Sequence, residues 1–205
     1  VACAGATPLW FMATLLIPET MTETEAEGIF DQVLEACGSL GVTLVGGHSE
    51  VTRTITQPIV VGCMLGEVQK SNIVRTGGAK EGASVVLTKG IAIEGTALLA
   101  YESAEALAKA GIIEGTVARA KELLFYPGIS IVPDVRVVCS AVSVTSLHDP
   151  TEGGLATGLW EVATAAGVGL EVDENTVQVL PESSEICKAL GLDPLGLLAS
   201  GSLLI

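Results

Sequence analysis

The residues from His148 to Leu155, HDPTEGGL, combine a carboxylate with a pair of glycines. Asp149 follows a β-type run, and Gly153-Gly154 opens the apolar pattern of a helix. A carboxylate is a Mg²⁺ ligand, and a helix N-terminus offers phosphate both N–H donors and a favourable dipole. The segment predicts a metal-bridged phosphate site, although an Asp N-cap or an Asp-Pro turn would use the same residues for structure alone.

A second glycine pair, Gly46-Gly47, follows the short β-type run 42–45. Paired glycines let a backbone approach a ligand closely and turn its N–H groups toward an anion. His48, Ser49 and Glu50 come next, so polar side chains would lie at the rim that a strand reaches. An ordinary tight turn is the alternative interpretation.

The segment 88–96, TKGIAIEGT, has the G-x-x-x-x-G spacing of a P-loop. Thr96 stands where that loop requires lysine, which excludes the Walker type of phosphate site. Lys89 is the one cation beside it. Another glycine-rich phosphate loop and a plain strand-to-helix turn both remain open.

Other site chemistries have little support in this chain. The five cysteines are dispersed, with no C-x-x-C pair, which is typical of reduced, buried thiols in a cytosolic protein. Two histidines alone do not make a zinc site. No nucleophile elbow, H-E-x-x-H, EF-hand or dinucleotide fingerprint is present.

Composition narrows the classes of protein further. The net charge of −14, from 10 Lys+Arg and 24 Asp+Glu, disfavours nucleic acid and anionic membranes as partners. An acidic chain can still bind ATP through backbone N–H groups and carboxylate-held Mg²⁺. Hydrophobic residues make up 49 %, which excludes intrinsic disorder. The apolar run Trp10–Ile17 is too short to span a membrane, and no basic segment precedes it as in a secretory signal.

The elements that must position these residues begin with a strand over 9–17. Thr22 and Glu25 form a capping box that opens a helix, and Gly41 is its expected stop. The next strand is expected over 59–68, and the residues from 69 to 82, rich in glycine and charge, are typical of a linker.

Beyond this linker, helices and strands alternate. We expect strands over 85–88, 142–147, 168–172 and 201–205, and helices over 94–110, 115–125, after Gly154 and over 181–190. Elements of both kinds in both halves predict an α/β or α+β protein of two domains.

The motifs ACAGATPL, GVTLVGGHSEVT, GASVVLTKG and HDPTEGGLATGLWEVATAAGVGLEVDE together resemble the AIR synthase-related superfamily. That group includes aminoimidazole ribonucleotide synthase, thiamine-monophosphate kinase, selenophosphate synthetase and HypE, and the likeness is nearest to HypE-like members. The resemblance implies an N-terminal domain over 1–70 that lacks its start and a C-terminal domain over 71–205 that lacks its end. It also implies homodimers built through the N-terminal sheets and ATP with Mg²⁺ held between the domains.

The same resemblance assigns roles to individual residues. It implies that Asp149 holds the metal and that Lys89 lies near the phosphates. We predict that both act in catalysis together with His148, which could donate to phosphate or serve only as a cap. HypE usually has arginine where this chain has His148 and Glu152, so the charge at that rim differs. The nucleotide-binding residues would be Gly46, Gly47, His48, Ser49, Glu50, Thr96, Thr151, Gly153 and Gly154.

The activity implied is ATP- and Mg²⁺-dependent activation of an amide or carbonyl oxygen by phosphoryl transfer in the cytoplasm. Two alternatives remain: a non-catalytic dimeric scaffold or degenerate paralogue that binds another maturation protein, and a small-molecule kinase of the thiamine-monophosphate type.

Overall fold

The strand β1, Thr7–Pro18, is the centre of a three-stranded sheet in the order β2-β1-β3. β2, Thr43–Thr52, runs parallel to β1, and β3, Ile59–Glu67, runs antiparallel to it. The computed structural model describes residues 1–205 and divides them into two compact units. The sheet belongs to the first unit, which comprises Val1–Ala2 and Ala6–Ile73.

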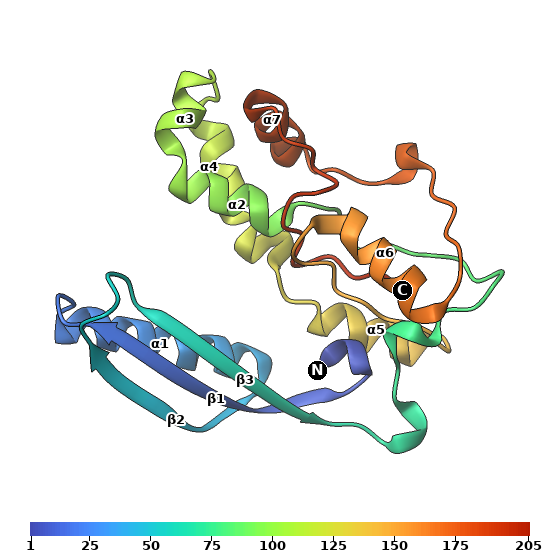
Figure 1. Cartoon of the computed structure of the whole chain (residues 1–205), viewed down its shortest axis with the longest axis horizontal. Coiled ribbons are helices and arrows are strands. Elements are labelled where there is room, and N and C mark those ends of the chain that lie inside the picture. Colours follow the sequence, from blue (N-terminus) through green and yellow to red (C-terminus); the bar gives the residue numbers. More distant parts are fainter. The chain divides into compact units, whose positions relative to one another are not determined.

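The helix α1, Glu23–Leu40, packs on one face of this sheet (Figure 1). Its start confirms the predicted capping box: the Thr22 hydroxyl accepts from the Glu25 N–H at 3.3 Å, and the Glu25 carboxylate accepts from the Thr22 N–H at 2.8 Å. Gly41 ends the helix in the left-handed conformation, with φ of 69°. Leu15 of β1, 2 % exposed, is the most buried residue beneath the helix.

Within the first unit no element covers the other face of the sheet, and apolar side chains remain exposed there. Strand alternation and register place even-numbered residues of β1 and odd-numbered residues of β3 on this face. We call this set the open sheet face. Its exposed members are Trp10, Met12, Ile59, Val61, Cys63 and Leu65.

The β-type run expected over 42–45 is too short, and the alternative of a tight turn at Gly46-Gly47 is wrong, because β2 continues through both glycines to Thr52. The pairing shifts by one residue at Val45, so that Phe11 faces Leu44 and Met12 faces Gly46. Parallel pairing with β1 on the far side of this bulge supplies the hydrogen bonds that a turn would have interrupted.

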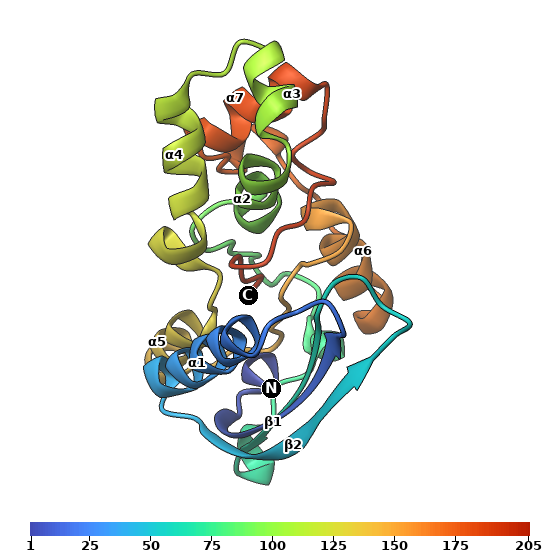
Figure 2. The ribbon, with the colours of Figure 1, turned by 90° about the vertical axis from the view of Figure 1, so that its left-hand side faces the viewer.

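The second unit comprises Cys3–Gly5 and Val74–Ile205 and is built mainly of helices (Figures 1 and 2). Two of its helices begin where the sequence predicted, one at the glycine pair Gly153-Gly154 and one at Pro181. In chain order they are α2 Ile93–Glu102, α3 Ala104–Lys109, α4 Glu114–Glu122, α5 Val132–Ala141, α6 Gly154–Ala166 and α7 Pro181–Leu190.

Two apolar clusters hold these helices. Helices α2, α3, α4 and α7 meet around Ala100, Leu107 and Ile186, all fully buried. Helix α6 packs through Leu155 and Val162 against Ile91 and Leu204 of the extended segments. The long helix expected over 94–110 is broken at Ser103, which separates α2 from α3.

The four strands expected in this half do not form ladders. Residues 85–88 and 201–205 pair only briefly: Val86 and Ile205 exchange two backbone hydrogen bonds and the Thr88 N–H donates to the Leu203 carbonyl, around the single bridge from Leu87 to Leu204. Residues 168–172 have no pairing partner. A β-type run becomes a strand of a sheet only when another backbone satisfies its N–H and C=O groups along its length. Residues 168–172 have no such neighbour, and the pairing of 85–88 with 203–205 does not extend far enough.

The helix α5 was not expected from its Val-rich sequence, although Pro133 in its first turn is a typical start signal. Residues Glu114–Ala141 are long and apolar enough, by length and composition, to cross a membrane as one helix. In this structure the run is not one helix, because the turn η4, Leu124–Gly128, separates α4 from α5 and Tyr126 within it is extended.

Candidate functional site

Asp149 lies in a loop whose backbone is held on both sides. Before it, His148 and Leu204 exchange backbone hydrogen bonds, at 3.0 Å from the His148 N–H and 2.8 Å from the Leu204 N–H. After it, Pro150 is fully buried against α6, where a Cβ on Gly158 would lie 2.6 Å from the Pro150 Cβ. The main chain of Asp149 is therefore fixed while its carboxylate is exposed.

One oxygen of this carboxylate has a partner in the protein. The Cys3 thiol, from the short helix η1, Ala2–Ala4, donates to Oδ1 of Asp149 over an S···O distance of 3.1 Å. Burial and then the neighbouring Asp149 raise the pKa of the Cys3 thiol, so it stays protonated and can donate. Oδ2 of Asp149 takes part in no hydrogen bond and is open to a ligand.

Sequence reasoning missed Cys3 as a neighbour of Asp149. The two residues are 146 positions apart, and the ACAGATPL motif contains no local signal for this contact. The contact is seen only in the structure, where residues 3–5 belong to the same compact unit as Asp149.

The two glycines that open α6 are required by their surroundings. Gly153 and Gly154 both have left-handed backbones, with φ of 76° and 64°. A Cβ on Gly154 would lie 2.5 Å from the carbonyl oxygen of Leu195 and 2.6 Å from that of Leu197. Glycine allows this close approach of two chain segments at the start of the helix.

The start of α6 keeps a free donor. Its N-cap has no side-chain hydrogen bond. The Gly154 N–H donates to the Thr151 carbonyl and the Ala156 N–H to the Leu195 carbonyl, and the Leu155 N–H between them belongs to a buried residue. The N–H of the N-cap residue Gly153, which is exposed, has no acceptor in the protein. The Thr151 hydroxyl donates to the Asp149 carbonyl at 3.2 Å. An uncapped helix start next to a carboxylate suits a phosphate that arrives with a metal.

His148 is anchored to the same helix. Its Nε2 lies 2.8 Å from Oε2 of Glu161 on α6, and its side chain is 18 % exposed. This nitrogen is engaged by the protein, so any contact of His148 with phosphate would have to use Nδ1.

Lys89 is engaged even more fully. Its ammonium donates to the carbonyls of Ser130 at 2.8 Å, Gly201 at 3.1 Å and Gly128 at 3.3 Å. Oδ2 of Asp134 lies 3.0 Å away, and both side chains are largely buried. An ammonium has three donors and all are used, so Lys89 joins three segments and has no proton left for phosphate.

Thr96 is a core residue of this structure. It is fully buried in α2, and its hydroxyl donates to the Ser183 hydroxyl of α7 at 2.9 Å. The side chain has no exposed atom that could meet a ligand, and we therefore leave both Thr96 and Lys89 out of the proposed site.

The segment from Gly46 to Glu50 lies in the first unit, exposed along β2. Gly47 has φ of 154°, and a Cβ there would overlap the Ala13 carbonyl of the neighbouring strand. His48 and Glu50 point to the same face and approach to 3.6 Å, with 66 % and 61 % of their side chains exposed. A shallow groove of about 420 Å³ runs beside them, lined by Ala13, Phe30 and residues 44–49.

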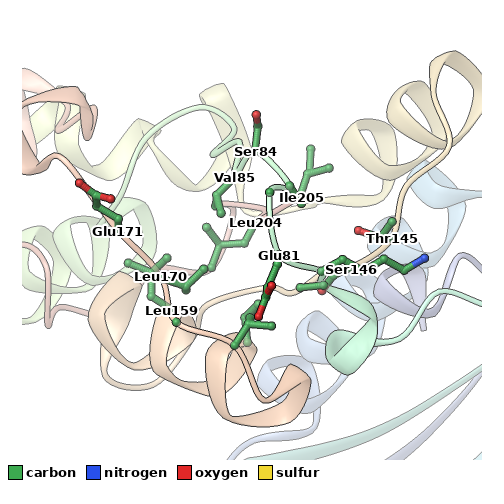
Figure 3. A pocket seen from close by; sticks show the side chains of 17 residues that line it. Glu81, Ser84, Val85, Thr145, Ser146, Leu159, Leu170, Glu171, Leu204 and Ile205 are labelled. Atoms are coloured by element: carbon green, nitrogen blue, oxygen red, sulfur yellow. The ribbon is translucent and has the colours of Figure 1, made fainter.

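The second unit also has a cavity of about 530 Å³ that no sequence-predicted residue lines (Figure 3). Leu159, Val162 and Leu204 are among its apolar lining residues, and Glu81 and Glu171 add two carboxylates. It lies among residues 79–85, 145–146 and 168–171 and the helix α6.

No group of three or more His, Cys, Asp or Glu side chains converges within residues 1–205. The protein alone therefore offers no complete cage for a cation. Mg²⁺ commonly binds through one or two carboxylates, several waters and the phosphates of a substrate. The exposed carboxylate of Asp149, shortly before the uncapped start of α6, fits an ion that comes with a nucleotide.

Comparisons with known proteins bear on both units. The AIR synthase related protein N-terminal domain matches residues 1–68, and the AIR synthase related protein C-terminal domain matches residues 80–205. The carbamoyl dehydratase HypE of Cupriavidus necator is 31 % identical over 205 residues, which cover 99 % of this chain and 55 % of the relative. The thiamine-monophosphate kinase of Pyrococcus horikoshii is 28 % identical over 202 residues, covering 98 % and 58 %. The chain thus spans little more than half the length of these relatives.

Solved structures share the fold at lower identity. E. coli HypE superposes with a TM-score of 0.83 at 21 % identity, covering 100 % of this chain and 60 % of its own. HypE in complex with ATP gives 0.77 at 22 % identity, covering 100 % and 58 %. HypE in a HypE–HypF complex gives 0.73 at 23 % identity, covering 98 % and 63 %.

The two domain matches fall on the two halves of the chain and together cover nearly all of it. The architecture, a sheet with one covering helix followed by a helix-rich unit, is that of the two-domain AIR synthase fold seen in HypE. The chain belongs to the AIR synthase-related protein family.

Proposed function

We propose that this chain contains the ATP-binding part of a Mg²⁺-dependent enzyme that activates an amide or carbonyl oxygen by phosphoryl transfer. The observation that supports it best is the exposed Asp149 carboxylate, with Oδ2 free, shortly before the uncapped start of α6, where the N–H of the exposed Gly153 has no acceptor in the protein. The HypE structure in complex with ATP, which shares this fold, supports a nucleotide as the ligand.

In this proposal the residues act by positioning charge. Asp149 would hold Mg²⁺, which when bound neutralises charge on the phosphates. The start of α6 would direct the Gly153 N–H and the helix dipole at a phosphate oxygen, and the two glycines Gly153 and Gly154 allow close approach there. His48, Ser49 and Glu50 on β2 stay predicted nucleotide contacts and can be tested by separate substitutions.

The relatives that are carbamoyl dehydratases suggest a carbamoyl group as the substrate. Dehydration removes the amide oxygen, which is a poor leaving group. Attack of that oxygen on the γ-phosphorus of ATP breaks the bond to ADP. Loss of the oxygen as phosphate, with the two nitrogen-bound protons released, then leaves a nitrile. The geometry needed is one that holds the two reactants in line.

The test is isothermal titration of the protein with ATP in the presence of Mg²⁺ and in EDTA. Binding that is tighter with Mg²⁺ than in EDTA, with this gain reduced by Asp149→Asn, is the expected result. Absence of binding at millimolar nucleotide would refute the proposal.

A small-molecule kinase is the second candidate, favoured by the similarity to thiamine-monophosphate kinase. The products separate the two reactions. A kinase moves the γ-phosphate to its substrate, whereas a dehydratase releases it as inorganic phosphate. A non-catalytic scaffold would bind nucleotide without consuming it.

We further propose that the chain acts in the cytoplasm as a homodimer through the open sheet face, whose apolar side chains are exposed. Six neighbouring apolar or thiol side chains on one face form the kind of patch that marks an interaction surface. The HypE–HypF complex suggests a second maturation protein as a further partner. Co-elution with a purified HypF on gel filtration would test that partner directly.

A further inference from the structure

We propose that Cys3 is a positioning residue for Asp149: its thiol holds Oδ1 and so presents Oδ2 to the metal. The inference rests on the proposed Mg²⁺ role of Asp149. It assigns a function to a residue that neither the domain matches nor the site motifs single out.

The Asp149 carboxylate has only one side-chain anchor. The backbone on either side is fixed by Leu204 and by the buried Pro150, but those contacts leave rotation about the side-chain bonds free. The Cys3 thiol at 3.1 Å is the only hydrogen-bond donor to the carboxylate itself. A carboxylate held at one oxygen loses less conformational freedom when a metal binds the other.

Cys3 is itself held in place. It lies in η1, and the carbonyl oxygen of the next residue, Ala4, accepts from the Val74 N–H at 3.1 Å. This bond fastens residues 3–5 to the start of the long segment of the second unit. The thiol therefore has a fixed point from which to orient Asp149.

A thiol suits this task chemically. It is a weak, neutral donor, so it can orient the carboxylate without neutralising the charge that attracts a cation. A lysine or arginine in its place would compete with the metal for the same charge. An aliphatic side chain would fill the space but leave the carboxylate free to rotate.

The first experiment compares Cys3→Ala with Cys3→Ser, which keeps a hydrogen-bond donor. The measured quantity is the Mg²⁺ concentration for half-maximal ATP binding by titration calorimetry. We expect Cys3→Ala to raise this Mg²⁺ concentration about three- to tenfold, as for one lost hydrogen bond, without changing ATP binding in EDTA. Cys3→Ser should restore the wild-type value to within about twofold. The matched control is Cys139→Ala, an exposed cysteine of α5, which should change neither value.

The outcomes separate this inference from the proposed function. If Asp149→Asn abolishes the gain in ATP affinity with Mg²⁺ while Cys3→Ala behaves as wild type, the role of Cys3 is refuted and the function stands. If Cys3→Ala weakened ATP binding equally with and without Mg²⁺, and Cys3→Ser did not restore it, Cys3 would be a packing residue only. If the wild-type protein shows no Mg²⁺-dependent binding, the proposed function itself fails.

A second measurement needs neither nucleotide nor metal. The infrared S–H band of Cys3, isolated as wild type minus Cys3→Ser, should lie at lower frequency than the band of the exposed Cys139. Asp149→Asn should move it upward, because a neutral amide is a weaker acceptor than a carboxylate. A Cys3 band that coincides with that of Cys139 and ignores Asp149→Asn would overturn the inference, even if Cys3→Ala did not fold.

Discussion

At the scale of single residues, two charged groups in the second unit show how partners determine a role. Asp149 is exposed and uses one oxygen, whereas Lys89 is largely buried and uses every donor. Both stand in motifs that suggest phosphate chemistry. The first has capacity left for a ligand, and the second stabilises the fold.

Replacing Asp149 with asparagine should weaken Mg²⁺-dependent ATP binding at least about tenfold, because the charge is removed while the shape is kept. Binding in EDTA should hardly change. Asp31→Asn, on the exposed surface of α1, is the matched control for the loss of one charge. Unchanged affinity of Asp149→Asn for Mg²⁺-ATP would refute its metal role.

Replacing Lys89 with methionine should lower the free energy of unfolding by about 2 to 4 kcal/mol, measured in urea. The substitution leaves the largely buried Asp134 carboxylate without its ion-pair partner and three carbonyl groups without their donor. Lys109→Met, which breaks an exposed pair with Glu105, should cost less than about 0.5 kcal/mol. A loss for Lys89→Met no larger than this control would contradict the structural role.

At the scale of elements, the helix starts are where local sequence and tertiary packing meet. The capping box of α1 is built entirely from residues close in sequence. The start of α6 instead depends on the carbonyls of Leu195 and Leu197, which approach it from a distant loop.

Gly154→Ala should destabilise the second unit by about 2 to 4 kcal/mol, because the new Cβ would collide with two carbonyl oxygens in addition to straining the backbone. Gly167→Ala, at the end of the same helix, has a similar φ of 68° but open space around it. It should cost only about 1 kcal/mol. Equal urea midpoints for the two variants would show that the close approach has no energetic weight.

The capping box of α1 predicts a pH dependence. Hydrogen bonds from the Thr22 N–H and hydroxyl, both at 2.8 Å, lower the pKa of Glu25. The unfolded chain, with the ordinary glutamate pKa, takes up this proton at higher pH than the folded one. The contribution of Glu25 to folding stability is therefore complete at pH values above the ordinary glutamate pKa of about 4.3. It is lost as the pH falls through the lower pKa of the folded state.

Glu25→Ala should accordingly reduce the thermal midpoint at neutral pH relative to Glu27→Ala, a neighbouring exposed position on the same helix. The difference between the two variants should shrink as the pH is lowered toward about 3. A difference that stays constant over this range would exclude the charged hydrogen bonds as its cause.

At the scale of the whole molecule, the open sheet face is the feature that needs a partner. A glutamate at Val61, which is 56 % exposed in the middle of that face, would place a charge where a second copy is expected to pack. Val61→Glu should therefore elute as a monomer, by light scattering, under conditions where the wild type is a dimer. Leu34→Glu, 51 % exposed on α1, should leave the dimer intact. A wild-type monomer at micromolar concentration would refute the dimer.

The sequence predicted well those elements whose signals are local. β1, α1 with both its caps, β3 and the starts of α6 and α7 agree with expectation, because alternation, capping residues and terminal glycines act within a few positions. The turn at Gly46-Gly47 and the strands of the second half were wrong, because strand pairing depends on a neighbour far away in the chain.

By itself, the sequence determined the fold class, the family and the position of Asp149 at the start of a glycine-led helix. The tertiary structure alone decided which motif residues remain available: it buried Thr96 against Ser183, surrounded Lys89 with carbonyls, and brought Cys3 to Asp149. The physical reason is that exposure and hydrogen-bond partners are set by segments distant in sequence, whereas spacing in a motif records only which residues are close along the chain.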